Sequence, residues 1–299
     1  MGVQVLSRAQ WAQREADHEV RVDSATAGHR ERRSTGRPHP VEDFLFTYYP
    51  FRPAALRRWH PGAGVHLADA ADERRAQWRH YRAVDGHVEL DTTAYLLSRG
   101  ETVAFVRRLL TATANRRAQL GCFGLHEWAM VYRQAAEEVR HRDWSLRLGA
   151  AGTDAVVEGL QLSCSHYDAF RFYTPAARPL NLLQPTRESQ VALEQPGCLH
   201  AGMDLYKWAM KLAPGLPSEL VMDCFDLARE IRALDMRASP YDLGSLGYAP
   251  VRIETAAGRA EYAAAQRDFA TRGQALRVRL LTALDGLDAV HSEAARAVG

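Results

Sequence analysis

Cysteine is scarce in this chain of 299 residues, which contains four. Cys122, Cys164, Cys198 and Cys224 lie far apart and form no Cys-x-x-Cys pair, so the sequence favours reduced, buried thiols over disulfides. No apolar run approaches the ~20 residues that a membrane-spanning helix needs. The first residues lack the basic and then apolar pattern of a secretory signal. These absences predict a cytoplasmic protein with no membrane partner.

The difference between the numbers of basic and acidic residues is also small. A total of 38 Lys and Arg against 36 Asp and Glu gives a formal net charge of +2, whereas a nonspecific nucleic-acid binder usually shows a clear basic excess. The basic residues gather locally, between positions 29 and 37 and at Arg57 and Arg58. Such basic segments are able to contact phosphates. Basic helix ends on a solvent-exposed surface would show the same pattern.

Several familiar catalytic motifs are missing. The sequence contains no Gly-x-x-x-x-Gly-Lys-[Ser/Thr] loop, no Gly-x-Gly-x-x-Gly after a strand and no Gly-x-Ser-x-Gly elbow. Nucleotide hydrolysis, dinucleotide redox chemistry and serine hydrolysis therefore lose support. The zinc motif His-Glu-x-x-His is absent as well.

Helical periodicity dominates what is present. The predicted fold class is mainly α, a single helical domain over residues 1–299 with a small antiparallel β-hairpin or sheet. An N-terminal helix within 1–36 packs on or extends from a core of about 40–250, and an exposed C-terminal helix spans about 255–287. No linker or internal repeat divides the chain.

Local signals refine this expectation. Ser7 is a suitable N-cap for the first helix, and Ser218 for another over 217–236. Asp85-Gly86 predicts the hairpin turn. We also expect a helix break near Gly100 and an extended stretch over 161–173.

The most unusual stretch is a helix predicted over about 198–213. It carries Lys207 and Lys211, the only lysines of the chain. His200 and Asp204 show the same four-residue spacing, so the four side chains share one helix face. A lysine amine, unlike a guanidinium, can lose its proton and act as a nucleophile. Either the lysines survive by chance in an arginine-rich chain, or this face is the wall of a site.

Acid–base chemistry at His200 and Asp204 is the first candidate, because a carboxylate beside an imidazole can orient it or activate water. The competing interpretation is a buried His–Asp hydrogen bond between helices. Glu127, next to His126, and Asp168 are further carboxylates that could act.

A ring-lined base pocket is the second candidate, since enzymes that act on nucleobases stack the base between aromatic side chains. Aromatic residues also fill helical cores, which is the commoner explanation for any one of them. The candidate base-binding residues are Tyr48, Trp128, Tyr206, His126 and His166. The candidate phosphate-binding residues are Arg171, Arg187 and Arg57.

A metal site is the third candidate. Two Cys-x-His units end at His166 and His200, and their ligand types suit iron or zinc. The alternative metal set is His166, His200, Asp204 and Asp223, the last from an acidic helix. Buried thiols and surface acids would give the same pattern without a metal.

Long runs at 39–49, 121–133, 165–172, 194–212 and 234–243 resemble a bacterial family labelled 3-methyladenine DNA glycosylase. The resemblance covers almost the whole chain. It implies hydrolysis of the N-glycosidic bond of an alkylated purine in damaged DNA, with no cofactor, an aromatic sandwich for the extruded base and a carboxylate that supports the cationic sugar. The Leu-Pro-Gly-x-Gly hairpin of helix-hairpin-helix glycosylases is absent, so no catalytic residue is assigned by motif.

On local chemistry we expect Asp204 to support the sugar or its attacking water, His200 to orient it, and Lys207 to bind a phosphate or form a Schiff base. Two alternatives remain open. One is a metal-dependent enzyme, with iron or zinc, that acts on a small molecule. The other is a noncatalytic nucleic-acid-binding or interaction protein, in which Arg30, Arg33 and Arg57 matter more than Asp204.

Overall fold

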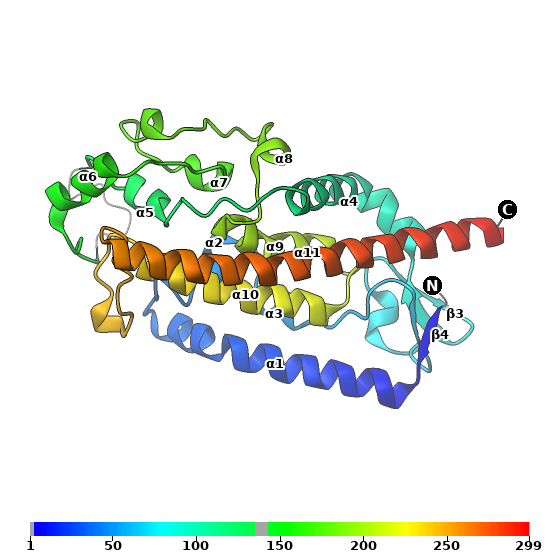
Figure 1. Cartoon of the computed structure of the whole chain (residues 1–299). Coiled ribbons are helices and arrows are strands. Elements are labelled where there is room, and N and C mark those ends of the chain that lie inside the picture. The colour runs from blue at the N-terminus through cyan, green and yellow to red at the C-terminus, as the bar shows by residue number, and fades with distance from the viewer. Residues whose placement is uncertain (1–2, 135–142, 299) are drawn as a thin grey trace.

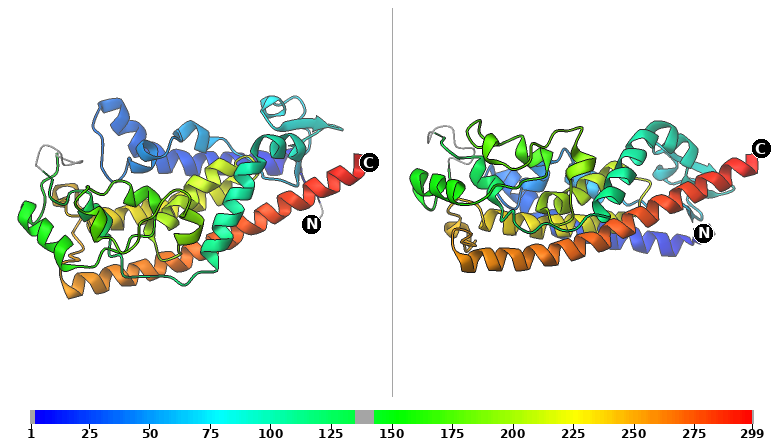
Figure 2. Two further views of the ribbon diagram at one scale, coloured as in Figure 1. Left: turned by 90° about the horizontal axis from the view of Figure 1, so that it is seen from above. Right: turned by 45° about the horizontal axis from the view of Figure 1, so that its top comes forward.

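A layer of long helices forms the body of the molecule, seen in a computed structural model that describes residues 3–134 and 143–298. At its centre α9 (Leu199–Leu212) packs against both α10 (Ser218–Arg237) and α11 (Ala256–Val298). On the outer side of α10 lies α1 (Arg8–Thr35) (Figure 1). On the opposite side α4 (Thr92–Ala114) packs on α11 and α9, and it crosses α11 steeply in Figure 2. The predicted mainly-α fold is confirmed.

Local sequence accounts for the ends of α1. Ser7 accepts a hydrogen bond from the backbone N–H of Gln10, whose side chain in turn accepts one from the Ser7 backbone, which is a capping box. Gly36 ends the helix with a φ of +66°, a left-handed conformation that glycine adopts without a Cβ clash. The predicted cap and stop are both present.

Short elements join the long helices and carry much of the site. Pro53 stands at the first turn of the short helix that it begins, where its missing backbone N–H leaves no hydrogen bond unmade. The short α-helices are α2 (Phe44–Tyr48), α3 (Pro53–Arg57), α5 (Leu125–Ala129), α6 (Gly149–Gly159), α7 (Tyr167–Phe170) and α8 (Gln190–Leu193). The 3-10 turns are η1 (Arg74–Gln77), η3 (Arg178–Leu180) and η4 (Gly244–Leu246).

A small sheet lies toward the end of the molecule that holds the C-terminal part of α11 (Figure 1). Its strand order is β1-β2-β4-β3, with β1 parallel to β2 and the other pairs antiparallel. The predicted turn at Asp85-Gly86 joins the last two strands, and both of its residues have positive φ. The sequence predicted an antiparallel sheet. The N-terminal strand β1 pairs in parallel with β2, so the sheet is mixed. The strands are β1 (Gln4–Leu6), β2 (Val65–Leu67), β3 (Tyr81–Val84) and β4 (His87–Leu90).

The main hydrophobic core joins α4, α9, α10 and α11, and a separate cluster around Trp11 and Trp59 supports the sheet. Cys164, Cys198 and Cys224 are buried, and all four cysteines are free thiols, as expected. No helix in the described residues is long and apolar enough to cross a membrane. That the chain is one domain stays a prediction.

Four local expectations were wrong. Helix α4 continues through Gly100, where a Cβ would meet no atom within 4 Å. The stretch 161–173 is not extended throughout, because it contains the turn of helix α7. Helix α11 runs on to Val298 and buries one face, with Leu280, Leu284 and Leu287 fully enclosed. Pro217, not Ser218, is the N-cap of α10.

Candidate functional site

The helix α9 supplies the centre of the site, as its polar stripe predicted. It packs closely on α10 because Gly202 has no side chain, and a Cβ there would lie 2.8 Å from Ile231. His200 and Asp204 are consequently buried, with 8% and 1% of their surfaces exposed. The part of the stripe that holds His200 and Asp204 therefore faces the protein interior between α2, α5, α7 and α10.

Asp204 is the acceptor of a buried ion-pair network. It accepts hydrogen bonds from the Tyr49 hydroxyl at 2.6 Å and from the Lys207 ammonium at 2.5 Å. Burial alone would raise the pKa of Asp204, but Lys207 and His166 hold that pKa well below its usual range. The carboxylate is therefore ionised, and each of its two oxygens accepts a hydrogen bond.

Lys207 bridges two carboxylates, since its ammonium also lies 2.9 Å from Asp168. Burial would lower the pKa of Lys207, yet Asp204 and Asp168 raise it well above its usual value. A protonated amine is not a nucleophile. This geometry argues against the predicted Schiff base. Both hydrogen bonds of the Lys207 ammonium are made to carboxylates of the protein, not to a phosphate. Lys211, by contrast, is exposed.

His166 lies between two carboxylates without a hydrogen bond to either. Its Nε2 atom is 3.4 Å from Asp204 and 3.6 Å from Glu194, and neither ring nitrogen has a hydrogen-bond partner among the described residues. Burial lowers the pKa of His166, but Asp204 brings it above its usual value. Its ring centroid is 5.3 Å from that of His200.

A second buried cluster lies on the other side of His200. The His126 Nε2 atom is 3.0 Å and 3.2 Å from the two carboxylate oxygens of Asp235, and the His126 and His200 rings are 4.4 Å apart. Arg232 donates to Glu127 at 2.8 Å and to Asp235 at 3.3 Å. Two helices, α5 and α10, thus bring four ionisable side chains close to the imidazole on α9.

The pKa values of the two imidazoles move in opposite directions. Burial lowers the pKa of His200 well below its usual value, and the nearby His126 lowers it further, so that the ring is neutral. Burial would also lower the pKa of His126, but Asp235 raises it well above its usual value.

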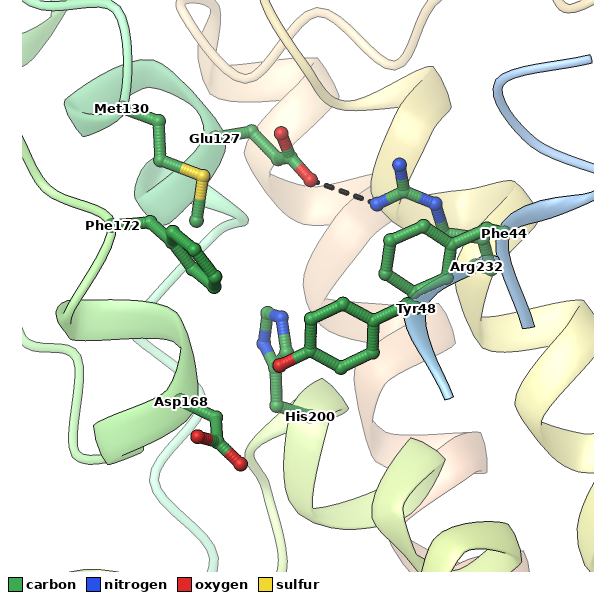
Figure 3. A pocket seen from close by; sticks show the side chains of 8 residues that line it. All are labelled: Phe44, Tyr48, Glu127, Met130, Asp168, Phe172, His200 and Arg232. Carbon is green, nitrogen blue, oxygen red and sulfur yellow. Dashed lines mark hydrogen bonds and ion pairs between the residues drawn. The ribbon is translucent and has the colours of Figure 1, made fainter. Parts of the chain in front are cut away.

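A small cavity of about 20 Å³ opens beside these groups, room for about one water molecule. His200, Glu127, Asp168 and Arg232 contribute its polar lining, as Figure 3 shows. The remaining lining residues are Phe44, Tyr48, Phe172 and Met130. We call this space the inner cavity.

A larger hollow of about 480 Å³ lies outside it, bordered by Trp144 and Arg171 among others. Phe44, Tyr48 and Phe172 line both spaces, so these three rings form the partition between them. The rings of Phe44 and Tyr48 stack at 5.0 Å, and Arg171 covers Phe172 at 4.3 Å. We call this space the outer hollow.

The structure brings most of the predicted residues together. Asp204, Lys207 and His166 form one buried network, and His126, His200 and Glu127 meet in the second cluster. Tyr48 and Asp168 line the inner cavity, and Arg171 lines the outer hollow.

Four predicted residues lie elsewhere. Trp128 is fully buried with its indole N–H on the Ala238 carbonyl, and Tyr206 is a fully buried core residue. Neither lines the inner cavity or the outer hollow. Arg57 is bound to Glu19 and Asp23 of α1, and Arg187 is exposed outside both spaces.

The predicted metal set is not assembled as expected. Asp223 faces α1 and α11, where it pairs with Arg21 at 2.8 Å and with Arg279 at 2.7 Å. Asp204 is already bound by Lys207. Of the four residues in that set, only His166 and His200 lie next to each other without a bound lysine or arginine side chain from the described residues.

Sequence reasoning missed Arg232 and Asp235. Both lie within a strongly amphipathic helix, and both are buried on its inner face at a spacing of three residues. Charged residues in the apolar face of a helix are a usable signal, because buried charges need partners. A role for Glu194 was also missed, and this residue carried no comparable signal.

Comparison of the chain with protein-family models, with curated proteins and with solved structures found no match. The functional conclusion therefore depends on the geometry of the site.

Proposed function

We propose that this chain hydrolyses the N-glycosidic bond of an alkylated purine such as 3-methyladenine, in DNA. One observation carries the proposal. A ring-lined hollow of a size that suits a base shares Phe44, Tyr48 and Phe172 with the inner cavity, and the inner cavity is lined by Asp168, a carboxylate that is held by two cations. Both parts are needed, because base excision combines an aromatic binding pocket with charge stabilisation at the sugar.

The outer hollow is the proposed base site. Its volume of about 480 Å³ falls within the roughly 300–1,000 Å³ of typical ligand pockets. Tyr48, Phe44 and Phe172 line this space with aromatic rings, and Trp144 and His39 border it as well. A flat, electron-poor alkylated purine gains stacking energy against such rings.

Phosphate contacts are available next to the hollow. A second hollow of about 610 Å³ shares Pro38, Asp43 and Thr47 with it and is lined by Arg33 and Arg52, both exposed. Guanidinium groups at this position can bind the backbone on either side of an extruded nucleotide. This arrangement replaces Arg57 and Arg187 as the proposed phosphate contacts.

Asp168 is the proposed catalytic carboxylate. It lines the inner cavity, and its two oxygens lie 2.9 Å from Lys207 and 3.3 Å from Arg171. A carboxylate here stabilises the positive charge that develops on the sugar as the bond to the base breaks. The base leaves with the bonding electron pair, which neutralises the positive charge of its alkylated ring. Water then adds its oxygen to the anomeric carbon and releases a proton to bulk solvent.

Asp204 has a different role in this proposal from the one that the sequence suggested. It does not line the inner cavity, and it holds Lys207, which in turn positions Asp168. Asp204 is therefore a positioning residue. The noncatalytic alternative has less support, because Arg30 and Arg57 are paired with Asp23 and Glu19.

The test is release of free 3-methyladenine from alkylated duplex DNA by the purified chain, with undamaged DNA as the control substrate. The proposal expects release from the alkylated duplex alone. Binding of both duplexes without release of base would contradict it and would favour the noncatalytic alternative.

A further inference from the structure

We propose that His126, His200 and Asp235 bind one divalent transition-metal ion, zinc or iron(II), beside the inner cavity. This site was not predicted from the sequence, whose metal set shared only His200 with it. The inference does not depend on glycosidic hydrolysis, since a metal here would bind whether or not the chain releases bases.

The donor atoms are already close. One nitrogen from each histidine and one oxygen of Asp235 all lie within 4.8 Å of one another. Zinc takes histidine nitrogens at about 2.0–2.1 Å and carboxylate oxygens at about 2.0–2.2 Å, which places two ligands of one tetrahedral ion roughly 3.3 Å apart. The 3.0 Å between His126 Nε2 and Asp235 Oδ1 is of that order.

Three different elements hold the donors rigidly. His126 is on α5, His200 on α9 and Asp235 on α10, and all three side chains are buried. Rigid, convergent ligands bind a metal more tightly than ligands that must be ordered first.

One oxygen of Asp235 lies in an ion pair with His126 but receives no hydrogen bond from a described residue. Its Oδ1 atom is fully buried and accepts no hydrogen bond from any described residue, although His126 Nε2 is 3.0 Å away. An unsatisfied buried oxygen is unfavourable, and a bound cation would satisfy it. Its other oxygen contacts Arg232 at 3.3 Å, the kind of outer contact that orients a metal-bound carboxylate.

The donor set selects the class of ion. Two imidazoles and one carboxylate suit zinc or iron, whereas magnesium and calcium prefer oxygen ligands. Three protein ligands leave a coordination position open, as in catalytic rather than structural sites. His200 and Glu127 also line the inner cavity, so a water ligand would face that space with a carboxylate nearby.

The neighbouring cluster of His166, Asp204 and Glu194 is a weaker candidate for a metal site. His166 contacts Asp204 and Glu194, but the ammonium of Lys207 lies 2.5 Å from Asp204, closer than the 3.3 Å between Arg232 and Asp235. The proposal therefore assigns His166 no role as a ligand.

The experiment is titration of chelator-treated full-length protein with Co²⁺, followed by its visible absorption, and with Zn²⁺, followed by calorimetry. The proposal expects one equivalent of metal per chain. His200→Ala and Asp235→Asn should each weaken binding at least 100-fold, with His126→Gln as a conservative third variant. Circular dichroism checks that each variant is folded.

His18→Gln and Asp223→Asn are the matched controls, because they remove a buried histidine on α1 and the carboxylate of the set predicted from the sequence. Both should bind metal like the wild type. The proposal is overturned if the wild-type chain binds no equivalent of either ion. It is equally overturned if folded His200→Ala and Asp235→Asn retain wild-type affinity, or if Asp223→Asn loses it.

Discussion

Lys207 donates a hydrogen bond of 2.5 Å to Asp204, three residues before it in α9, and the pair is largely buried, with 13% of the Lys207 side chain and 2% of the Asp204 side chain exposed. The second lysine of the chain, Lys211, lies one turn further along the same helix and is exposed. The two lysines therefore form a natural comparison between a buried and a solvated ammonium group.

Lys207→Met should lower the free energy of unfolding by about 3–5 kcal/mol, because it leaves the buried Asp204 carboxylate without its cation. Lys211→Met should change it by less than about 0.5 kcal/mol, as expected for a surface substitution. Urea unfolding followed by circular dichroism measures both. Equal effects of the two substitutions would show that the Lys207–Asp204 pair is not the buried interaction described above.

Asp204→Asn follows the same reasoning. The sequence suggested a catalytic role for Asp204, but its burial and its bonds to Tyr49 and Lys207 predict that this variant is a less stable protein. We expect a loss of several kcal/mol on the scale of a broken buried pair. Unchanged stability of Asp204→Asn would argue against its role as a positioning residue.

His60 should make stability depend on pH. Burial lowers its pKa from 6.5 to about 3, and Arg58 and Arg75 contribute. Below pH 6.5 the unfolded chain binds a proton that the folded chain does not bind, so the free energy of unfolding falls by about 1.4 kcal/mol per pH unit as the pH decreases toward the folded pKa. Above pH 6.5 the stabilising contribution is fully present.

His60→Gln isolates this contribution, since other groups titrate equally in both proteins. Urea unfolding at pH 7, 6, 5 and 4 should give a shallower decline for the variant than for the wild type. Parallel stability curves would show that His60 titrates alike in the folded and unfolded chains.

Phe172→Ala should weaken binding of a purine in the outer hollow and join that hollow to the inner cavity, because Phe172 lines both. A lost stacking face costs about 1–3 kcal/mol, or roughly 5- to 150-fold in affinity. Equilibrium binding of 3-methyladenine, followed by tryptophan fluorescence, measures the change. Phe105→Ala is the control, because Phe105 packs on Trp208 outside both spaces.

Much of the fold could be predicted because its signals are local. The capping box at Ser7 and the turn at Asp85-Gly86 involve neighbours in sequence. Gly100 misled the prediction because an isolated glycine lowers helix propensity by only about 1 kcal/mol, which the packing of α4 on α11 outweighs.

The site was less predictable because its residues converge from distant parts of the chain. His126 and Glu127 are adjacent in sequence, yet one contacts Asp235 and the other Arg232, both on α10. Position in the sequence does not show which face of α5 meets α10. The polar stripe on α9 could be predicted from spacing alone. The hydrogen bonds that its residues make with Tyr49 and Asp168 depend on tertiary packing.

The rate of 3-methyladenine release from alkylated duplex DNA under single-turnover conditions tests the central proposal most directly. Wild-type protein should release the base, and Asp168→Asn should release it about 100-fold or more slowly while remaining folded. Asp288→Asn, an exposed carboxylate paired with Arg107 on α4, should match the wild type. No release by the wild type, or equal rates for Asp168→Asn and the wild type, would contradict the assignment.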